Sequence, residues 1–192
     1  MGLPAGAHAL VKSATPATLT AQHATSGALM LKFSGAVNFT FDGVAVKGGG
    51  ATLTLSNVVS DTTGDLLVKN GTLVFDYGAG WGGSSNVTVG AGALLKVTAA
   101  GAPTAFAPIV PGKQLSLVNL KLEADGGNYG QLDLGGNVAV RSLRIGDTFM
   151  PPGDYGSTAS GAANPNDSHF TGTGVLHVRR ASLAEGFHLI LR

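Results

Sequence analysis

A short phrase, Gly-x-Leu-x-Leu or a close variant of it, returns at nearly constant spacing through the chain and limits the folds open to it. Its opening glycines are 21, 21, 20 and 18 residues apart. A period of this size is typical of a solenoid, in which each coil buries its apolar face only against its neighbours. The phrases open at Gly50, Gly71, Gly92, Gly112 and Gly130.

The residues between these glycines indicate strands rather than helices. Apolar and polar residues alternate in short runs, as in Leu53-Thr54-Leu55, and the runs are bounded by Gly, Asn, Asp or Ser. A second strand is expected between successive phrases, at Val58-Val59, Val87–Val89 and Val138–Val140. We therefore expect an all-β protein, a right-handed parallel β-helix with coils of roughly 20 residues.

An antiparallel β-sandwich is the alternative fold. A sandwich also has short strands that return every 8–12 residues or so, so the density of strands alone does not decide between the two folds. A sandwich gives no reason, however, for one phrase to return at a fixed period.

The length of 192 residues predicts one domain with a sizeable core. The open end of a β-helix exposes unpaired strand edges that need a cover, so 1–28 is expected to form an N-terminal cap or first coil. Residues 29–149 are expected to form coils, 150–173 a long ordered loop, and 174–192 a C-terminal strand and cap.

Composition excludes several classes of protein. Hydrophobic residues make up 44% of the chain and its net charge is +1, so it should fold and has no strong field to attract nucleic acid. Without cysteine, it has no disulfide, thiol nucleophile or cysteine metal site. No apolar run approaches the roughly 20 residues that a membrane helix needs. Neither nucleic acid nor membrane is an expected partner.

Two stretches carry a resemblance to known proteins. Leu143-Arg144-Ile145-Gly146, Pro152-Gly153-Asp154-Tyr155-Gly156 and the run from Phe170 to Val178 together resemble the closing segment of autotransporter-associated β-strand repeat proteins. The segment from Thr72 to Val97, which contains Trp81-Gly82-Gly83, also looks like such a repeat. This resemblance implies a β-helical stalk of a large secreted bacterial protein.

Taken as a module of this length, residues 50–178 also resemble the β-helical carbohydrate-binding modules that accompany xylanases in enzymes of gut bacteria. This resemblance implies an extracellular or cell-surface location, a plant cell-wall polysaccharide such as xylan as ligand, and a covalently linked glycoside hydrolase. The module itself would be non-catalytic and would hold the enzyme near its substrate. The alternatives are a structural β-helical stalk or passenger segment and, third, a small polysaccharide lyase.

Aromatic residues within glycine-rich turns are the first candidates for a binding site. Sugar rings stack on the faces of such side chains. Trp81, with Tyr77 nearby, and Tyr129 two coils later are expected on exposed loops of equal phase, where they would line one groove. The alternative is that Trp81 packs over the edge of a coil.

Polar residues around those rings are the second set. Asp125, Asn128 and Gln131, with Asp76 and Asn86, carry groups that hydrogen-bond sugar hydroxyls. The alternative is that such side chains form turns and stack in ladders between coils.

Catalysis and metal binding have weaker signals. Glu123 and Asp125 would share one strand face about 6.6 Å apart, within the separation of about 5–9.5 Å that glycoside hydrolysis uses. Lys121 is the nearby base for a lyase, but no dense acidic set accompanies it. Asn164–Asp167 and Asp61–Asp65 hold oxygen ligands for a structural calcium ion without matching a calcium motif. The sequence therefore predicts no catalytic residues, no metal ligands and no cofactor.

Overall fold

The computed structural model of the protein describes residues 8–22, 27–42, 52–55, 61–62, 64–81, 86–106, 109–110, 113–114 and 117–180. Within these residues the elements are strands, apart from a single turn of 3-10 helix, η1 (Thr158–Ser160). The expected all-β class is confirmed.

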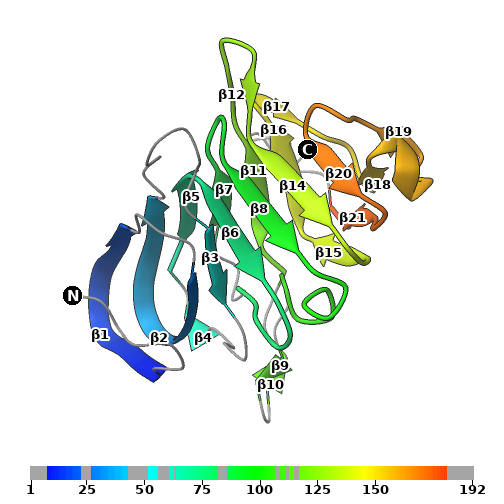
Figure 1. Ribbon diagram of the computed structural model, residues 1–192. Helices are drawn as coiled ribbons and strands as arrows, with labels where there is room; N and C mark the ends of the chain where they lie inside the picture. Colours follow the sequence, from blue (N-terminus) through cyan, green and yellow to red (C-terminus); the bar gives the residue numbers. More distant parts are fainter. Residues whose placement is uncertain are drawn as a thin grey trace, which may run out of the picture.

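Most strands belong to two parallel sheets that share strand β2 (Gly27–Asp42) (Figure 1). In sheet A the second part of β2 is followed by β5 (Leu66–Asn70), β7 (Asn86–Val89), β11 (Asn119–Leu122) and β16 (Ser142–Ile145). In sheet B the start of β2 is followed by β3 (Thr52–Leu55), β6 (Thr72–Phe75), β8 (Leu94–Val97), β14 (Gln131–Leu134) and β20 (Phe170–Gly172).

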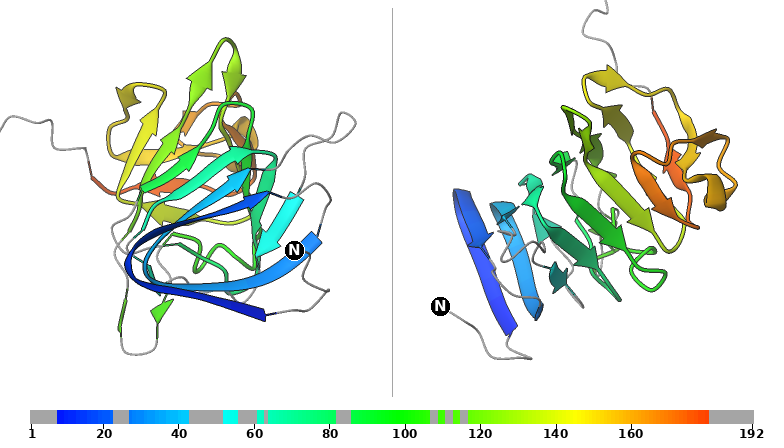
Figure 2. Two further views of the ribbon diagram at one scale, coloured as in Figure 1. Left: turned by 90° about the vertical axis from the view of Figure 1, so that its left-hand side faces the viewer. Right: turned by 45° about the horizontal axis from the view of Figure 1, so that its top comes forward.

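The long strands β1 (His8–Gln22) and β2 lie at one end of the molecule. They run parallel to each other and curve round that end, as Figure 2 shows. The short strand β4 (Asp61–Thr62) also pairs with β2 in parallel. Of the expected N-terminal segment 1–28, the described part is thus β1 and the first residues of β2.

Among the strands that the structure describes, antiparallel pairing is confined to local connections and to the C-terminal end. It joins β9 (Ile109–Val110) to β10 (Lys113–Gln114), β12 (Ala124–Asp125) to β13 (Asn128–Tyr129), and β16 to β17 (Thr148–Phe149). At the C-terminal end, β18 (Gly153–Gly156) is antiparallel to β21 (Leu176–Val178) but parallel to β19 (Asn164–Pro165), while β21 is parallel to β15 (Val138–Val140). Because the strands of the two large sheets pair in parallel, the alternative prediction of an antiparallel sandwich is wrong for them.

Alternation along each strand directs one set of side chains into a shared core. Because neighbouring strands are in register, like positions stack on like positions: Leu53, Leu73, Leu95 and Leu132 form one row of sheet B. All four are buried, as is the facing row of sheet A, and burial of each such side chain stabilises the fold by about 1.5–3 kcal/mol. The facing row is made of Leu66, Val87, Leu120 and Leu143.

Two of the repeated glycines turn the chain from sheet A into sheet B. Gly71 links β5 to β6 with φ of 74°, and Gly92 lies between β7 and β8 with φ of 81°. Residues with a Cβ rarely adopt this left-handed conformation, so glycine suits these corners. The predicted phrase thus marks a real corner at these positions.

The expected coil at Gly112 is wrong. Lys113 and Gln114 form β10, which pairs with β9, whereas β8 pairs directly with β14 in sheet B. Leu132 and Leu134 of β14 oppose the buried side chains of β8, so β10 adds no strand to sheet B between them. Gly50, Gly112 and Val58-Val59 lie outside the described residues.

Residues 150–173 also differ from the expected loop. They contain β18, η1, β19 and β20, and β20 completes sheet B beside β14. Hydrogen bonds fix the turns between them: Asp167 accepts from Thr158 N at 2.8 Å, and Ser157 Oγ accepts from Ala159 N at 3.2 Å. Strand β21 lies where a C-terminal strand was expected, and residues 181–192 lie outside the described part.

Candidate functional site

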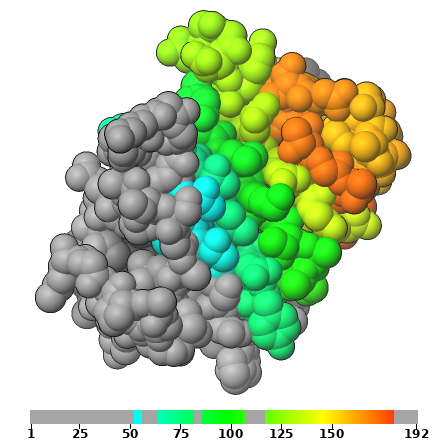
Figure 3. Space-filling view, viewed as in Figure 1, coloured from blue at the N-terminus to red at the C-terminus, as the bar shows by residue number. Residues whose placement is uncertain are grey.

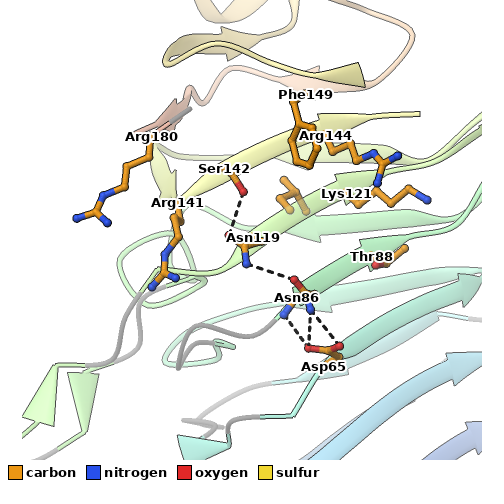
Figure 4. Close-up of a pocket in the computed structure, with 11 residues that line it drawn as sticks. Asp65, Asn86, Thr88, Asn119, Lys121, Arg141, Ser142, Arg144, Phe149 and Arg180 are labelled. Atoms are coloured by element: carbon orange, nitrogen blue, oxygen red, sulfur yellow. Dashed lines mark hydrogen bonds between the residues drawn. The ribbon is translucent and has the colours of Figure 1, made fainter. Parts of the chain in front are cut away.

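The outward face of sheet A carries a groove of about 600 Å³, here called the basic groove (Figure 4). It crosses the starts of four neighbouring strands, β5, β7, β11 and β16. Most of the described lining residues are polar or cationic. The lining residues within the described part of the chain are Asp65, Asn86, Thr88, Asn119, Leu120, Lys121, Arg141, Ser142, Arg144, Phe149 and Arg180.

In-register pairing gathers these side chains into two rows across the strands. The first residues of β7, β11 and β16 are Cα partners, and so are the third residues. Because residues i and i+2 of a strand share a face, both rows lie on the outward side of sheet A. The first row contains Asn86, Asn119 and Ser142, and the second contains Thr88, Lys121 and Arg144.

The first row is a continuous hydrogen-bonded ladder. Asp65 Oδ1 accepts from Asn86 N at 2.8 Å, and both of its carboxylate oxygens accept from Asn86 Nδ2 at 3.1 Å. Asn119 Nδ2 donates to Asn86 Oδ1 at 3.2 Å, and Ser142 Oγ donates to Asn119 Oδ1 at 2.9 Å. The ladder holds the floor of the basic groove in one arrangement, while a second N–H of Asn119 remains as a further donor.

An arginine and an aromatic ring form one margin of the basic groove. Arg144 and Phe149 are opposite each other in the β16–β17 hairpin, and the guanidinium carbon lies 5.2 Å from the ring centroid. A guanidinium over a ring face at this distance is held by a cation–π attraction. Arg144 Nη2 also donates to Asp147 Oδ1 at 2.9 Å, and Phe149 is 53% exposed.

The other cations lie on both sides of the ladder. Lys121 Nζ pairs with Glu123 Oε1 at 3.1 Å, next to Arg144 in the same row. Arg141 and Arg180 lie on the opposite side of the ladder, where Arg180 N donates to the Arg141 carbonyl at 2.9 Å (Figure 4). The floor formed by Asn86, Asn119 and Ser142 is therefore neutral and polar, Asp65 adds one negative charge at its end, and both margins are positive.

A second pocket of about 570 Å³ continues along the same face toward the ends of the strands. Lys121 lines both pockets, but the acidic residues Glu123, Asp125 and Asp147 line only the second one. Charge therefore changes along sheet A, from positive at the strand starts to mixed at the strand ends.

The expectation that Trp81 lies on an exposed loop is wrong. Its side chain is 1% exposed within the core, and Nε1 donates to the Gly64 carbonyl at 2.9 Å. The preceding Gly80 lies so close to another segment that a Cβ would be 1.9 Å from the Thr104 carbonyl oxygen. Here glycine permits close backbone packing that buries the indole, so Trp81 cannot present a face to a sugar.

The expected grouping of aromatic residues along one groove is also wrong. Tyr77 follows the end of β6, whereas Tyr129 precedes the start of β14, and these strands run parallel in sheet B. The two rings therefore lie beyond opposite ends of the sheet. Tyr77 is 66% exposed, and Tyr129 meets the ring of buried His169 edge-on with centroids 4.9 Å apart.

Three of the five predicted polar residues, Asp125, Asn128 and Gln131, lie in or next to the β12–β13 hairpin, which connects β11 to β14 and projects at the top of the molecule in Figures 1 and 3. Asp125 and Asn128 are paired across its turn and are exposed. Gln131 Nε2 donates to the Ser168 carbonyl at 3.4 Å. The structure thus brings Asp125, Asn128, Gln131 and Tyr129 together, away from Tyr77 and Trp81.

Of the two remaining polar candidates, Asn86 lies in the basic groove and belongs to its ladder. Asp76 accepts from Thr98 Oγ1 at 2.7 Å, between neighbouring turns after β6 and β8. Both therefore join neighbouring strands or turns, which is the structural alternative that the sequence left open for such side chains.

Two titratable groups outside the groove, His177 and Tyr155, make local contacts. His177 Nδ1 lies 2.6 Å from Asp154 Oδ1 across the β18–β21 pair. Burial raises the pKa of Tyr155 above its ordinary value, and its hydroxyl donates to the Pro151 carbonyl at 2.8 Å. Within the described ranges, no three His, Cys, Asp or Glu side chains are grouped to hold a metal ion, and no helix has the length and apolarity to cross a membrane.

Sequence reasoning missed the site that the sheets assemble. Alternation does place Asn119 with Lys121, and Ser142 with Arg144, on one face of their strands. The intervals between paired positions are uneven, however: 33 residues from Asn86 to Asn119 and 23 from Asn119 to Ser142. Because no fixed period links these residues, the repeat in the sequence did not predict that they are neighbours.

No protein-family model, curated protein or solved structure matches this chain.

Proposed function

We propose that the protein is a right-handed parallel β-helix that binds a plant cell-wall polysaccharide, such as a xylan, in the basic groove. The observation that carries this proposal is the pair of aligned polar rows on the outward face of sheet A. Such a groove offers the few well-placed polar groups and the exposed ring that a sugar ligand uses.

The spacing of the strands supports a chain-like ligand. Neighbouring strands lie about 4.8 Å apart, so the row from Asp65 to Ser142 extends over about 14 Å. A β-1,4-linked pyranose chain advances by about one strand spacing for each sugar ring. A polysaccharide lying along the rows would therefore meet a further pair of polar side chains, one from each row, at each successive sugar.

The solenoid interpretation rests on the parallel, in-register pairing of both sheets. Sheet A and sheet B alternate along the chain, and their inward rows share one core. Each turn would then bury its apolar side chains against the turns beside it, as in other solenoids. The loops between β8 and β14 would be insertions that lengthen individual turns without breaking the stack.

We infer a binding role rather than catalysis because the carboxylates beside the basic groove already have hydrogen-bond or ion-pair partners. Asp65, Glu123 and Asp147 each accept hydrogen bonds or pair with a cation beside the basic groove. These contacts suit side chains that fix the groove. A covalently attached glycoside hydrolase at the cell surface would gain local substrate concentration from such a module.

A structural stalk is the second candidate. Within the described residues β1 pairs with β2 alone, so its other edge has backbone groups available to a further strand. A stalk would use that edge to continue the stack and would have no affinity for polysaccharide.

Affinity electrophoresis through gels that contain xylan, glucan, mannan or pectin tests the proposal. We expect at least one polysaccharide to retard the full chain and Phe149→Ala to reduce that retardation by about 10-fold in affinity, the effect of losing roughly 1.4 kcal/mol. Tyr77→Ala discriminates between sites because Tyr77 is also an exposed ring but lies outside the basic groove. Loss of binding in Tyr77→Ala alone would place the site elsewhere, and no retardation by any polysaccharide would favour the stalk.

A further inference from the structure

We propose that the basic groove selects polysaccharides that carry uronic acid groups. This inference rests on the proposed function and names the class of ligand. Among the residues that the structure describes, the groove is lined by four cations, Lys121, Arg141, Arg144 and Arg180, and one anion, Asp65, a difference of +3. The whole chain has a net charge of only +1, so positive charge is concentrated in this groove.

The second row places like charges side by side. Lys121 and Arg144 are Cα partners on neighbouring strands. Like charges at paired positions of a sheet destabilise it, and a bound anion would relieve that repulsion. The corresponding row of sheet B contains Lys96 beside Asp133, where Nζ and Oδ2 lie 2.7 Å apart and the charges cancel.

Their ion pairs leave Lys121 and Arg144 able to bind a ligand. The partners of Lys121 and Arg144 are Glu123 and Asp147, which lie on the side of the second pocket rather than in the basic groove. Asp147 has a side chain that is 95% exposed. Exposed pairs of this kind contribute about 0–1 kcal/mol, so a ligand carboxylate competes with them easily.

Donor capacity also remains. An ammonium group has three N–H donors and a guanidinium has five, and a guanidinium binds a carboxylate through two parallel hydrogen bonds. Arg144 donates a hydrogen bond to Asp147 through Nη2. Its Nε is buried and has no hydrogen-bond partner in the described part of the chain. The ring of Phe149 fixes the guanidinium plane at the margin of the groove.

The arrangement of charge fits a sugar chain. Cations flank a neutral floor of Asn86, Asn119 and Ser142 on both sides, so carboxylates that project to alternate sides of an extended chain would each find a cation (Figure 4). Hydroxyl groups would face the floor. A nucleic acid duplex fits less well, because binding it depends on many phosphate contacts and a strongly basic surface.

The test compares each acidic polysaccharide with the same polymer after its carboxyl groups are reduced to alcohols. Glucuronoxylan and polygalacturonate serve as probes, and binding is measured by titration calorimetry with the full chain at low and high salt. We expect each bound native polymer to bind about 10-fold or more tighter than its reduced form. We also expect high salt to weaken this preference, because the charges are exposed.

Lys121→Gln and Lys96→Gln form a matched pair of variants. Each lysine is the third residue of its strand and is paired with a carboxylate, but only Lys121 lines the basic groove. We expect Lys121→Gln to weaken binding of the native polymer by about 10-fold and to leave the reduced polymer within about 2-fold. Lys96→Gln should leave both within about 2-fold.

The possible outcomes separate the two proposals. Equal binding of native and reduced polymers, or equal effects of the two lysine variants, overturns the selection for uronic acids and leaves polysaccharide binding intact. Duplex DNA that binds as tightly as the acidic polymers also overturns the selection, because the groove would then attract any polyanion. If none of the polymers binds, whether native, reduced, or the neutral glucan and mannan, both proposals fail.

Discussion

The outward faces of sheets A and B differ although the two sheets are built alike. Both consist of parallel strands in register, with buried rows of leucine and valine toward the shared core. Outward, sheet B sets Lys96 beside Asp133, whereas sheet A sets Lys121 beside Arg144 and a ladder of amide side chains. In-register pairing thus aligns side chains in either sheet, and the residue types at the outward positions decide which face gathers cations.

The largest effect that we predict is the same in both sheets. Leu120→Ala in sheet A and Leu132→Ala in sheet B should each lower the free energy of unfolding by about 2–5 kcal/mol, because each removes a fully buried side chain and leaves a cavity. Urea unfolding monitored by circular dichroism measures this loss. A small loss for one variant alone would show that the two sheets do not share equivalent packing.

The core could be predicted from the sequence because period-2 alternation and the glycine phrases are local signals. Leu73 and Leu95 are 22 residues apart and occupy paired positions, close to the expected coil length. From Leu95 to Leu132 the interval is 37 residues, because the chain between them contains the β9–β10 and β12–β13 hairpins in addition to strand β11. The period therefore predicted the early part of sheet B correctly and failed where insertions lengthen the chain.

Trp81 shows why glycine is ambiguous in a sequence. Glycine occurs in exposed turns, and it also occurs where two backbones come too close for a Cβ. Gly80 belongs to the second class, since its neighbour across the contact is the Thr104 backbone. Composition around Trp81 does not distinguish these cases, and only the tertiary packing shows that the indole is buried.

A smaller difference in unfolding free energy should separate variants at the first strand positions of the two sheets. Asn119 and Gln131 are the first residues of β11 and β14, but Asn119 makes two ladder hydrogen bonds, whereas Gln131 makes one contact at 3.4 Å. We expect Asn119→Ala to cost about 1–3 kcal/mol, the sum of two such bonds. Gln131→Ala should change the unfolding free energy by less than about 0.5 kcal/mol.

Chemical denaturation of both variants under the same conditions measures this difference. Equal losses of unfolding free energy in the two variants would mean that the ladder does not stabilise sheet A more than Gln131 stabilises sheet B. The basic groove would then lack the rigid floor on which its proposed selectivity depends.

Disulfide cross-linking tests most directly whether the paired residues of neighbouring strands lie side by side. The chain has no cysteine of its own, so introduced cysteines can pair only with each other. Thr88 and Lys121 are Cα partners, so the double variant Thr88→Cys/Lys121→Cys places the two Cα atoms about 5 Å apart, within disulfide reach. In Thr88→Cys/Asn119→Cys the separation is about 8 Å, which is too long. We predict that mild oxidation closes the first disulfide and not the second, as measured by intact mass, and closure of the second in preference to the first would contradict the in-register stack.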